Sequence, residues 1–127
     1  MAGEKIGILL CNLRQYPEAI VQFDQLVRTN PNDASAHYGL GYAYFKAGQY
    51  EEAVEAFSDA IALRPEYAEA YFARGHAYHQ LDEKHSAGAD RIEAIRLRPA
   101  FRSQSYRKLK AGKNKERTGS GSAKLAE

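Results

Sequence analysis

The sequence predicts an all-α solenoid of three stacked helix–turn–helix repeats, followed by a C-terminal capping helix. A proline, a glycine and an alanine each recur every 34 residues along the chain. They are Pro31, Pro65 and Pro99, then Gly7, Gly41 and Gly75, then Ala19, Ala53 and Ala87. Three pairs keep this spacing, which we call the repeat period, and they are Tyr44 with Tyr78, Ala60 with Ala94, and Phe23 with Phe57. A fixed period of this length is typical of solenoids, in which each unit buries its apolar face on the next.

The middle repeat shows the two helices of one unit. Residues 34–47 are rich in Ala, Tyr and Leu, and Gly48 in the stretch AGQY ends this first helix. Residues 51–63 place apolar side chains three, four and seven positions apart, which is the spacing of one helix face. Asp33 suits the N-cap of the first helix, and the proline of the dipeptide at 64–65 stops the second.

The second helix of the last repeat departs from this pattern. Arg91 stands at the place that Phe23 and Phe57 hold in the first two repeats. Gly88 lies inside the same helix, where glycine costs about 1 kcal/mol relative to alanine. Both features predict a terminal helix that is less buried than its counterparts.

Beyond the third repeat the sequence becomes polar. Residues 102–110 keep only Tyr106 and Leu109 as large apolar residues, so we expect a solvating cap helix there. Gly, Ser, Lys and Thr dominate residues 111–127, which we expect to form a disordered basic tail.

Composition and charge are those of a globular chain with a basic end. Hydrophobic residues make up 44% of the 127 positions and charged residues 27%. Residues 1–101 carry 10 Lys and Arg against 14 Asp and Glu, a net charge of −4, whereas residues 102–127 carry 8 against 2, a net charge of +6. The one cysteine, Cys11, cannot form an internal disulfide, so a cytoplasmic location is expected. No apolar run approaches the ~20 residues that cross a bilayer, so no membrane span is expected.

The repeat pattern resembles the tetratricopeptide repeat family. The residues that carry the resemblance are Leu40, Gly41, Tyr44, Ala53, Phe57, Ala60 and Pro65 in the second repeat, Gly75, Tyr78, Ala87, Ala94 and Pro99 in the third, and Gly7, Ala19, Phe23 and Pro31 in the first. It implies one domain over residues 1–110, with repeats at about 1–33, 34–67 and 68–101 and the cap helix at 102–110. It also implies a non-catalytic scaffold or adaptor that binds a protein or peptide partner.

Four aromatic rings crowd the first helix of the middle repeat, and helix geometry separates them. Tyr38, Tyr42 and Phe45 follow the spacing i, i+4, i+7 and therefore share one face. Tyr44 points roughly 160° away from their mean direction and aligns with the repeat glycine Gly41, so we assign it to the core. A row of rings that the core does not use is typical of an interaction surface.

By resemblance, the first helix of each repeat lines a concave groove that binds a peptide or a partner helix. The implied groove residues are Ile8 in the first repeat, Tyr38, Tyr42, Phe45 and Lys46 in the second, and Glu69, Phe72, His76, His79 and Gln80 in the third. Neighbouring groove positions hold Glu4, Cys11, Asn12 and Ser35.

The best-known groove of the family is a carboxylate clamp. It grips the acidic C-terminal tail of heat-shock chaperones with Lys, Asn and Arg side chains. The corresponding positions here are Glu4, Ile8, Gly39, Glu69 and Ala73. None of them can hold a carboxylate, so we expect no chaperone-tail clamp and a ligand that is apolar or bears aromatic side chains.

Other functions find less support. His76 and His79 lie one turn apart, but zinc takes three or four protein ligands, so no metal site is expected. The basic tail and the groove aromatics leave a nucleic-acid-associated protein as the alternative, although the net-negative body would repel a polyanion. There is no phosphate-binding loop, paired-cysteine motif or HExxH, so we expect neither an enzyme nor a cofactor. The apolar edge formed by Ile6, Leu9 and Leu10 suggests self-association.

Overall fold

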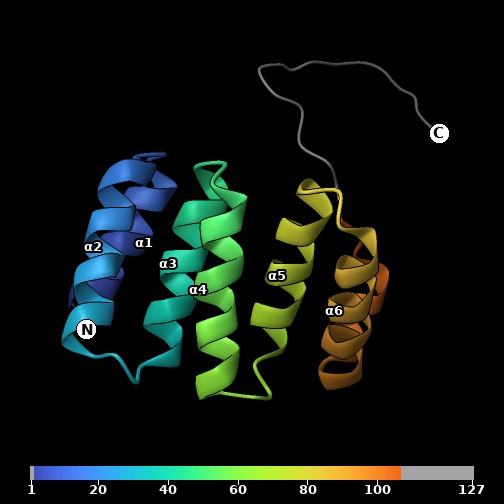
Figure 1. Cartoon of the computed structure of the whole chain (residues 1–127). Helices are drawn as coiled ribbons and strands as arrows, with labels where there is room; N and C mark the ends of the chain where they lie inside the picture. Colours follow the sequence, from blue (N-terminus) through green and yellow to red (C-terminus); the bar gives the residue numbers. More distant parts are fainter. Residues whose placement is uncertain (1, 107–127) are drawn as a thin grey trace, which may run out of the picture.

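The computed structural model describes residues 2–106, and this part of the chain contains six α-helices and no strand (Figure 1). The helices are α1 (Ala2–Asn12), α2 (Tyr16–Thr29), α3 (Ala34–Lys46), α4 (Tyr50–Leu63), α5 (Ala68–Gln80) and α6 (Lys84–Leu97), and a 3₁₀ helix, η1 (Pro99–Ser103), follows them. The predicted all-α repeat architecture is confirmed. The tail predicted over 111–127 lies outside the described residues.

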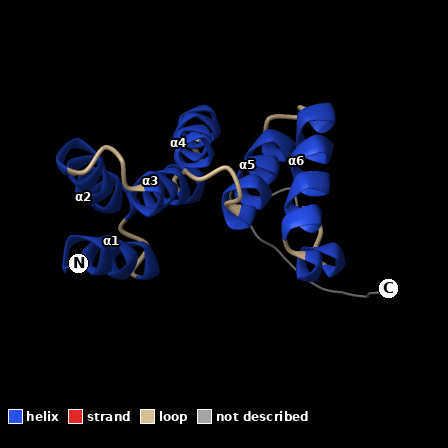
Figure 2. Cartoon of the chain, turned by 90° about the horizontal axis from the view of Figure 1, so that it is seen from below, coloured by secondary structure: helices blue, strands red, loops and turns tan. Residues whose placement is uncertain are grey.

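The helices stack as three successive pairs. Within each repeat α1 packs on α2, α3 on α4 and α5 on α6, while α2 on α3 and α4 on α5 join the repeats. The first helices also touch in succession, α1 with α3 and α3 with α5. Seen from below, α1 and α3 lie on one side of the stack and α2 and α4 on the other (Figure 2). The first helices therefore share one face of the molecule.

Local signals set the ends of the second repeat's first helix. The Asp33 carboxylate accepts hydrogen bonds from the backbone N–H groups of Ser35, at 3.1 Å, and Ala36, at 3.4 Å, which caps the start of α3. At the turn after α3, Gly48 adopts a φ of +83°. Arg14 and Asp82 hold the equivalent turn positions with φ of 62° and 61°, so the turn geometry recurs even where glycine does not.

Two phenylalanines fill the contacts within the first two helix pairs. A Cβ atom on Gly7 would lie 2.6 Å from the ring of Phe23, and one on Gly41 would lie 2.6 Å from the ring of Phe57. The rings therefore occupy the space that any larger residue at the glycines would need. Phe57 is completely buried and Phe23 nearly so. These glycine–phenylalanine contacts hold each pair at close range.

The third repeat has a charged interior instead. Arg74, which stands one repeat period after Leu40, donates from Nε and Nη2 to the two carboxylate oxygens of Asp90, both at 2.8 Å. Its Nη1 also donates to Ser58 Oγ at 3.0 Å. Asp90 is buried, and it stands one repeat period after Ala56. The hydrogen bonds to Asp90 raise the pKa of Arg74, so its guanidinium stays charged at all ordinary pH values.

The repeat glycine of this unit meets a ring that comes from beyond α6. A Cβ atom on Gly75 would collide with the Oη of Tyr106, just as the equivalent glycines would collide with Phe23 and Phe57. Arg91, at the phenylalanine position of α6, points elsewhere and donates to the backbone carbonyl of Gln104. It also donates to the carbonyl of Arg102, at 3.1 Å.

The cap helix expected over 102–110 differs in its described part. The 3₁₀ helix η1 ends at Ser103, and Gln104 is extended, with φ −104° and ψ 144°. The physical reason is that Arg91 takes up two backbone carbonyls of this stretch and Tyr106 reaches in to Gly75. Residues 107–110 lie outside the described part of the chain.

Candidate functional site

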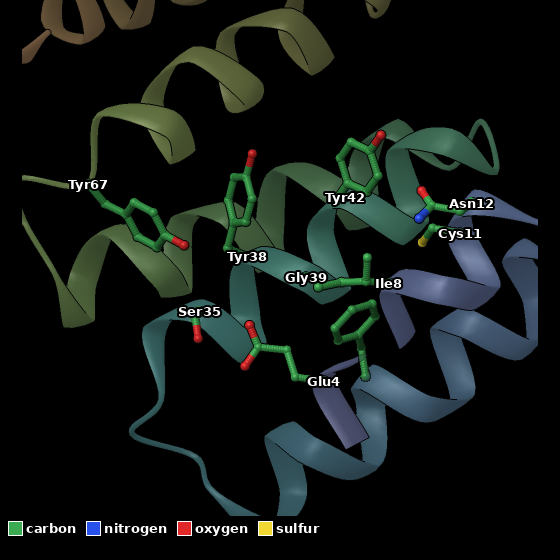
Figure 3. Close-up of a pocket in the computed structure, with 10 residues that line it drawn as sticks. Glu4, Ile8, Cys11, Asn12, Ser35, Tyr38, Gly39, Tyr42 and Tyr67 are labelled. Atoms are coloured by element: carbon green, nitrogen blue, oxygen red, sulfur yellow. The ribbon is translucent and has the colours of Figure 1, made fainter. Parts of the chain in front are cut away.

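A hollow of about 450 Å³ opens between α1 and α3 on the face of the first helices (Figure 3). Figure 3 shows Tyr38 and Tyr42 projecting from α3, Ile8 of α1 beside Gly39, and Tyr67 reaching in from the loop before α5. The volume falls within the range of about 300–1,000 Å³ that is common for ligand pockets. The lining residues are Glu4, Ile8, Cys11, Asn12, Phe23, Ser35, Tyr38, Gly39, Tyr42 and Tyr67.

A second hollow of about 200 Å³ continues the first toward α5. Tyr38 and Tyr42 line both hollows, so the two tyrosines form the wall between them. The second hollow is more enclosed by rings, since its lining also includes Phe45, Phe57, Phe72, His76 and Phe101, together with Glu69 and Ala73. We call the two hollows together the groove.

Three predicted residues lie where the repeat pattern places them. Ile8 is 49% exposed and Tyr42 is 41% exposed. Tyr38 is half-buried, with its ring centroid 5.5 Å from that of Phe57 and 5.2 Å from that of Tyr67. Burial raises the pKa of Tyr38 to about 12, so its hydroxyl is a neutral donor throughout the physiological range.

Phe45, also predicted to line the groove, lines the second hollow but exposes little of its side chain. Phe45 is buried in the core, and its ring lies 5.3 Å from that of Tyr50 and 4.8 Å from that of His76. Helix geometry sorted the rings of α3 correctly by direction, but α4 and α5 approach from both sides and cover the end of that face. Tyr44, assigned to the core, is half-buried and packs between the first two repeats.

The groove residues predicted in the third repeat are covered by the chain itself. The ring of Phe101 stacks on Phe72 with centroids 4.6 Å apart and an interplanar angle of 8°. The ring of Tyr106 lies 5.0 Å from Phe72, 5.5 Å from His76 and 5.9 Å from His79. The groove is therefore wide between α1 and α3 and narrowed by residues 101–106 at α5.

Charged side chains stand at the borders of the groove. Glu69 is bound to Arg98 at 2.6 Å between Oε2 and Nη2. The ammonium group of Lys46, which is exposed, lies 6.0 Å from the centroid of the Tyr42 ring. Gln80, at the far end of α5, is half-buried. Glu4 is the charged residue that lines the larger hollow, which is consequently mildly acidic.

Cys11 and the edge of α1 clarify two further expectations. Cys11 is buried in the core of the first repeat, and burial raises the pKa of its thiol, so it is not an activated nucleophile. Of the apolar edge residues, Ile6 is 47% and Leu9 is 55% exposed, whereas Leu10 packs against the core. Two of the three predicted edge residues are thus exposed.

Tyr67 and Phe101 are groove residues that the sequence reasoning missed. They stand one repeat period apart, and each follows the proline that ends a repeat's second helix. The guanidinium of Arg64 lies 4.2 Å from the ring of Tyr67, and that of Arg98 lies 5.5 Å from the ring of Phe101. This arginine–aromatic pair, repeated in register, was the signal that could have identified them.

Within residues 2–106, no group of three or more His, Cys, Asp or Glu side chains is placed to hold a metal ion. None of the helices in this described range combines the length and the apolar character that a bilayer crossing requires.

Solved structures with the same fold include MamA, which is 29% identical with a TM-score of 0.75 over 78% of this chain and 58% of that one. A MamA chain (41-end) from Desulfovibrio magneticus RS-1 is 28% identical, with a TM-score of 0.74 over 83% and 58% of the two chains. The present chain therefore spans little more than half of these MamA chains.

The first TPR domain of Spaghetti (RPAP3), solved with the HSP90 peptide SRMEEVD, is 24% identical with a TM-score of 0.75, over 77% of this chain and 78% of that one. At that identity the likeness shows the fold alone. Among curated proteins, none matches the chain significantly.

Sequence profiles of a known family match the repeats themselves. The profile described as TPR repeat matches residues 9–48 and 41–82, and the profile described as Tetratricopeptide repeat matches residues 68–101. Together these matches run without a break from the first helix pair to the end of the third. The chain belongs to the tetratricopeptide repeat family, whose members are protein–protein interaction modules.

Proposed function

We propose that this chain is a scaffold or adaptor that binds an apolar or aromatic-bearing peptide, or a partner helix, in the open part of the groove between α1 and α3. The observation that carries the proposal is the hollow of about 450 Å³ with Ile8 and Tyr42 on its rim. Exposed anchors beside a preformed hollow are the features that concentrate binding energy in interfaces. The unpaired Cys11 keeps a cytoplasmic location as the prediction.

The available anchors limit the affinity. Each fully buried large apolar side chain contributes ~1.5–3 kcal/mol. Two or three anchors therefore supply ~3–9 kcal/mol before the cost of ordering the peptide is subtracted. This corresponds to micromolar binding or weaker, since a Kd of ~1 μM is about −8 kcal/mol. We expect an exchangeable adaptor contact rather than a permanent complex.

The chemistry of the groove disfavours an acidic ligand. Glu4 lines the open hollow, and Glu69 at its border is already bound to Arg98. An acidic chaperone tail of the kind bound by Spaghetti would meet these carboxylates instead of basic side chains. We therefore keep the proposal that this chain has no carboxylate clamp.

The nucleic-acid alternative is weaker for the same region. The rings that could stack on bases, Phe72, His76 and His79, already pack against Phe101 and Tyr106. The basic residues of the predicted tail lie outside the described part of the chain. Salt separates the two proposals, because binding through phosphates weakens steeply with salt, whereas an apolar groove responds little.

Substitution of Tyr42 tests the groove. Tyr42→Ala removes the exposed ring on α3, and Ile92→Ala is the matched control because Ile92 is 70% exposed on α6, at the other end of the stack. Full-length chains are used as baits in parallel, and the candidate partner is then titrated by calorimetry. We expect Tyr42→Ala to weaken binding about tenfold or more and Ile92→Ala to leave it unchanged. Equal affinity for wild type and a folded Tyr42→Ala would refute the groove proposal.

A further inference from the structure

One helix pair of the solenoid lacks the ring that fills its counterparts. In the first two repeats a phenylalanine of the second helix fills the slot against the glycine of the first helix. In the third repeat that position is Arg91, and the slot beside Gly75 is filled by Tyr106, which lies beyond α6. A slot that one helix leaves empty and a separate segment fills has the form of a binding site.

We propose that the slot between α5 and α6 is a docking site for a short segment bearing two aromatic side chains, and that residues 101–106 occupy it as an intramolecular ligand. This inference concerns the end of the groove opposite to the proposed α1–α3 site. It rests on the proposed function and deepens it, because it identifies the segment that covers the α5 end of the groove. It also identifies the kind of side chain, aromatic, with which a partner would compete with that segment.

The contacts of the segment are those of a bound peptide. Phe101 stacks on Phe72 at 4.6 Å, and the ring of Tyr106 lies 5.0 Å from the same side chain. Between the two rings, Arg91 donates to the backbone carbonyls of Arg102 and Gln104. The ring contacts favour aromatic side chains at the two anchor positions. Arg91 binds only backbone carbonyls, so it places no requirement on the side chains between the two anchors.

The side chains between the two anchors do not take part. Arg102, Ser103, Gln104 and Ser105 are all exposed. Helices α5 and α6 are held to each other independently of this segment. Two hydrogen bonds join Arg74 to Asp90, and buried alanines lie on both helices. Release of the segment therefore leaves the helix pair joined.

The second anchor fits incompletely. The Oη atom of Tyr106 is buried and has no hydrogen-bond partner among the described residues. A buried hydroxyl without a partner weakens the interaction that buries it. The equivalent slots of the first two repeats hold phenylalanine, which has no hydroxyl. A segment with phenylalanine at the second anchor should consequently dock more tightly than the chain's own segment.

Undocking would change the groove. Phe101 lines the second hollow, and the two rings of the segment cover Phe72, His76 and His79. Removal of the segment extends the open surface from α3 to α5 and exposes the row of rings that the repeat register predicts. A partner with two suitable aromatic side chains would thus gain a longer groove by displacing residues 101–106.

A labelled peptide with the sequence of residues 98–106, RPAFRSQSY, tests the site. Its fluorescence anisotropy is followed while the full-length wild type and the full-length Phe101→Ala/Tyr106→Ala variant are titrated in. We expect the variant to bind at least about tenfold more tightly, because its slot is empty. Replacing the peptide's last residue by phenylalanine should tighten binding further. Equal binding to both proteins, or no binding to the folded variant, would overturn the proposal.

Arg91→Phe provides an independent measurement. The substitution restores the ring that α4 supplies through Phe57, so the slot is filled from α6 and residues 101–106 are released. We expect circular dichroism like that of the wild type and at least about tenfold faster tryptic cleavage after Arg102. Unchanged cleavage would contradict the proposal. Loss of helical signal in Phe101→Ala/Tyr106→Ala would also contradict it, because the segment would then be part of the fold. Neither readout uses Tyr42, so this inference and the proposed α1–α3 site can fail separately.

Discussion

The second and third repeats share one register but fill it with opposite chemistry. Leu40 and Ala56 of the second repeat correspond to Arg74 and Asp90 of the third, which form an ion pair between a half-buried guanidinium and a buried carboxylate. Phe57 corresponds to Arg91, whose place in the slot is taken by Tyr106. Both repeats nevertheless form the same helix pair. The difference shows what a helix pair of this fold needs. The facing side chains of the two helices must complement each other, and a ring must fill the slot beside the glycine. The facing side chains can be apolar or charged.

The polar version has a consequence for stability. An apolar contact gains free energy from burial alone, whereas a buried ion pair must first offset the desolvation of two charges. The third repeat also fills its slot with a side chain from a separate segment. We therefore expect the second repeat to be the more stable one. The third repeat should lose stability whenever one partner of its ion pair, or the ring in its slot, is removed.

The largest difference should appear when each slot is emptied. Phe57→Ala removes a fully buried ring and should lower the free energy of unfolding by about 3–5 kcal/mol. Tyr106→Ala should cost clearly less, because the ring lies at the edge and its buried hydroxyl is unsatisfied. Urea unfolding followed by circular dichroism measures both values. Equal losses would contradict the distinction between a core ring and a docked ring.

Converting the ion pair into its apolar counterpart sharpens the comparison. Asp90→Ala leaves the Arg74 guanidinium without its partner and should cost about 3 kcal/mol. The double variant Arg74→Leu/Asp90→Ala copies Leu40 and Ala56 and should return to within about 1 kcal/mol of the wild type, or exceed it. The same urea titrations give the coupling energy between the two sites. A double variant as unstable as Asp90→Ala would show that the pair cannot be replaced in this position.

The smallest expected effect concerns a phenol that only one repeat carries. Tyr38 corresponds to Phe72, and burial raises the pKa of Tyr38 from 10.0 to about 12 in the folded chain. Between these values the unfolded chain has lost a proton that the folded chain retains, so stability is full below pH 10 and falls as the pH rises toward 12. Phenylalanine has no hydroxyl to ionise, so Tyr38→Phe should lose less stability than the wild type as the pH rises from 10 to 12. The difference in the free energy of unfolding should reach up to about 2 kcal/mol. Alkaline denaturation of both proteins measures it, and identical pH slopes would contradict the assignment.

The repeat architecture was predictable because its signals are local and periodic. Proline, glycine and alanine recur with one period, and each type has one role at a helix end or a close helix contact. The same register placed Ile8, Tyr38 and Tyr42 on the face of the first helices, where the structure has them. A periodic rule works for these residues because the neighbouring helices of the solenoid set their surroundings.

The failures lie where contacts come from outside the periodic unit. Phe45 lines the second hollow but is mostly buried, because the rings of Tyr50 and His76 pack against it from α4 and α5. The predicted cap helix starts with a short 3₁₀ turn and an extended stretch, because Arg91 captures backbone carbonyls that a helix would use internally. No pattern within one helix carries information about either event.

By itself, the sequence determined the number of repeats, the helix pairs and the face on which the aromatic side chains gather, since these follow from spacing along the chain. Only the tertiary structure decided that the groove is open at Ile8 and Tyr42 and narrowed at Phe72, where Phe101 stacks on the ring. The physical reason is that the exposure of a side chain depends on residues that are distant in the sequence but pack against it in the fold. Arg91 creates a vacancy in the third helix pair, and whether that vacancy is filled by Tyr106 depends on contacts between parts of the chain that no spacing rule connects.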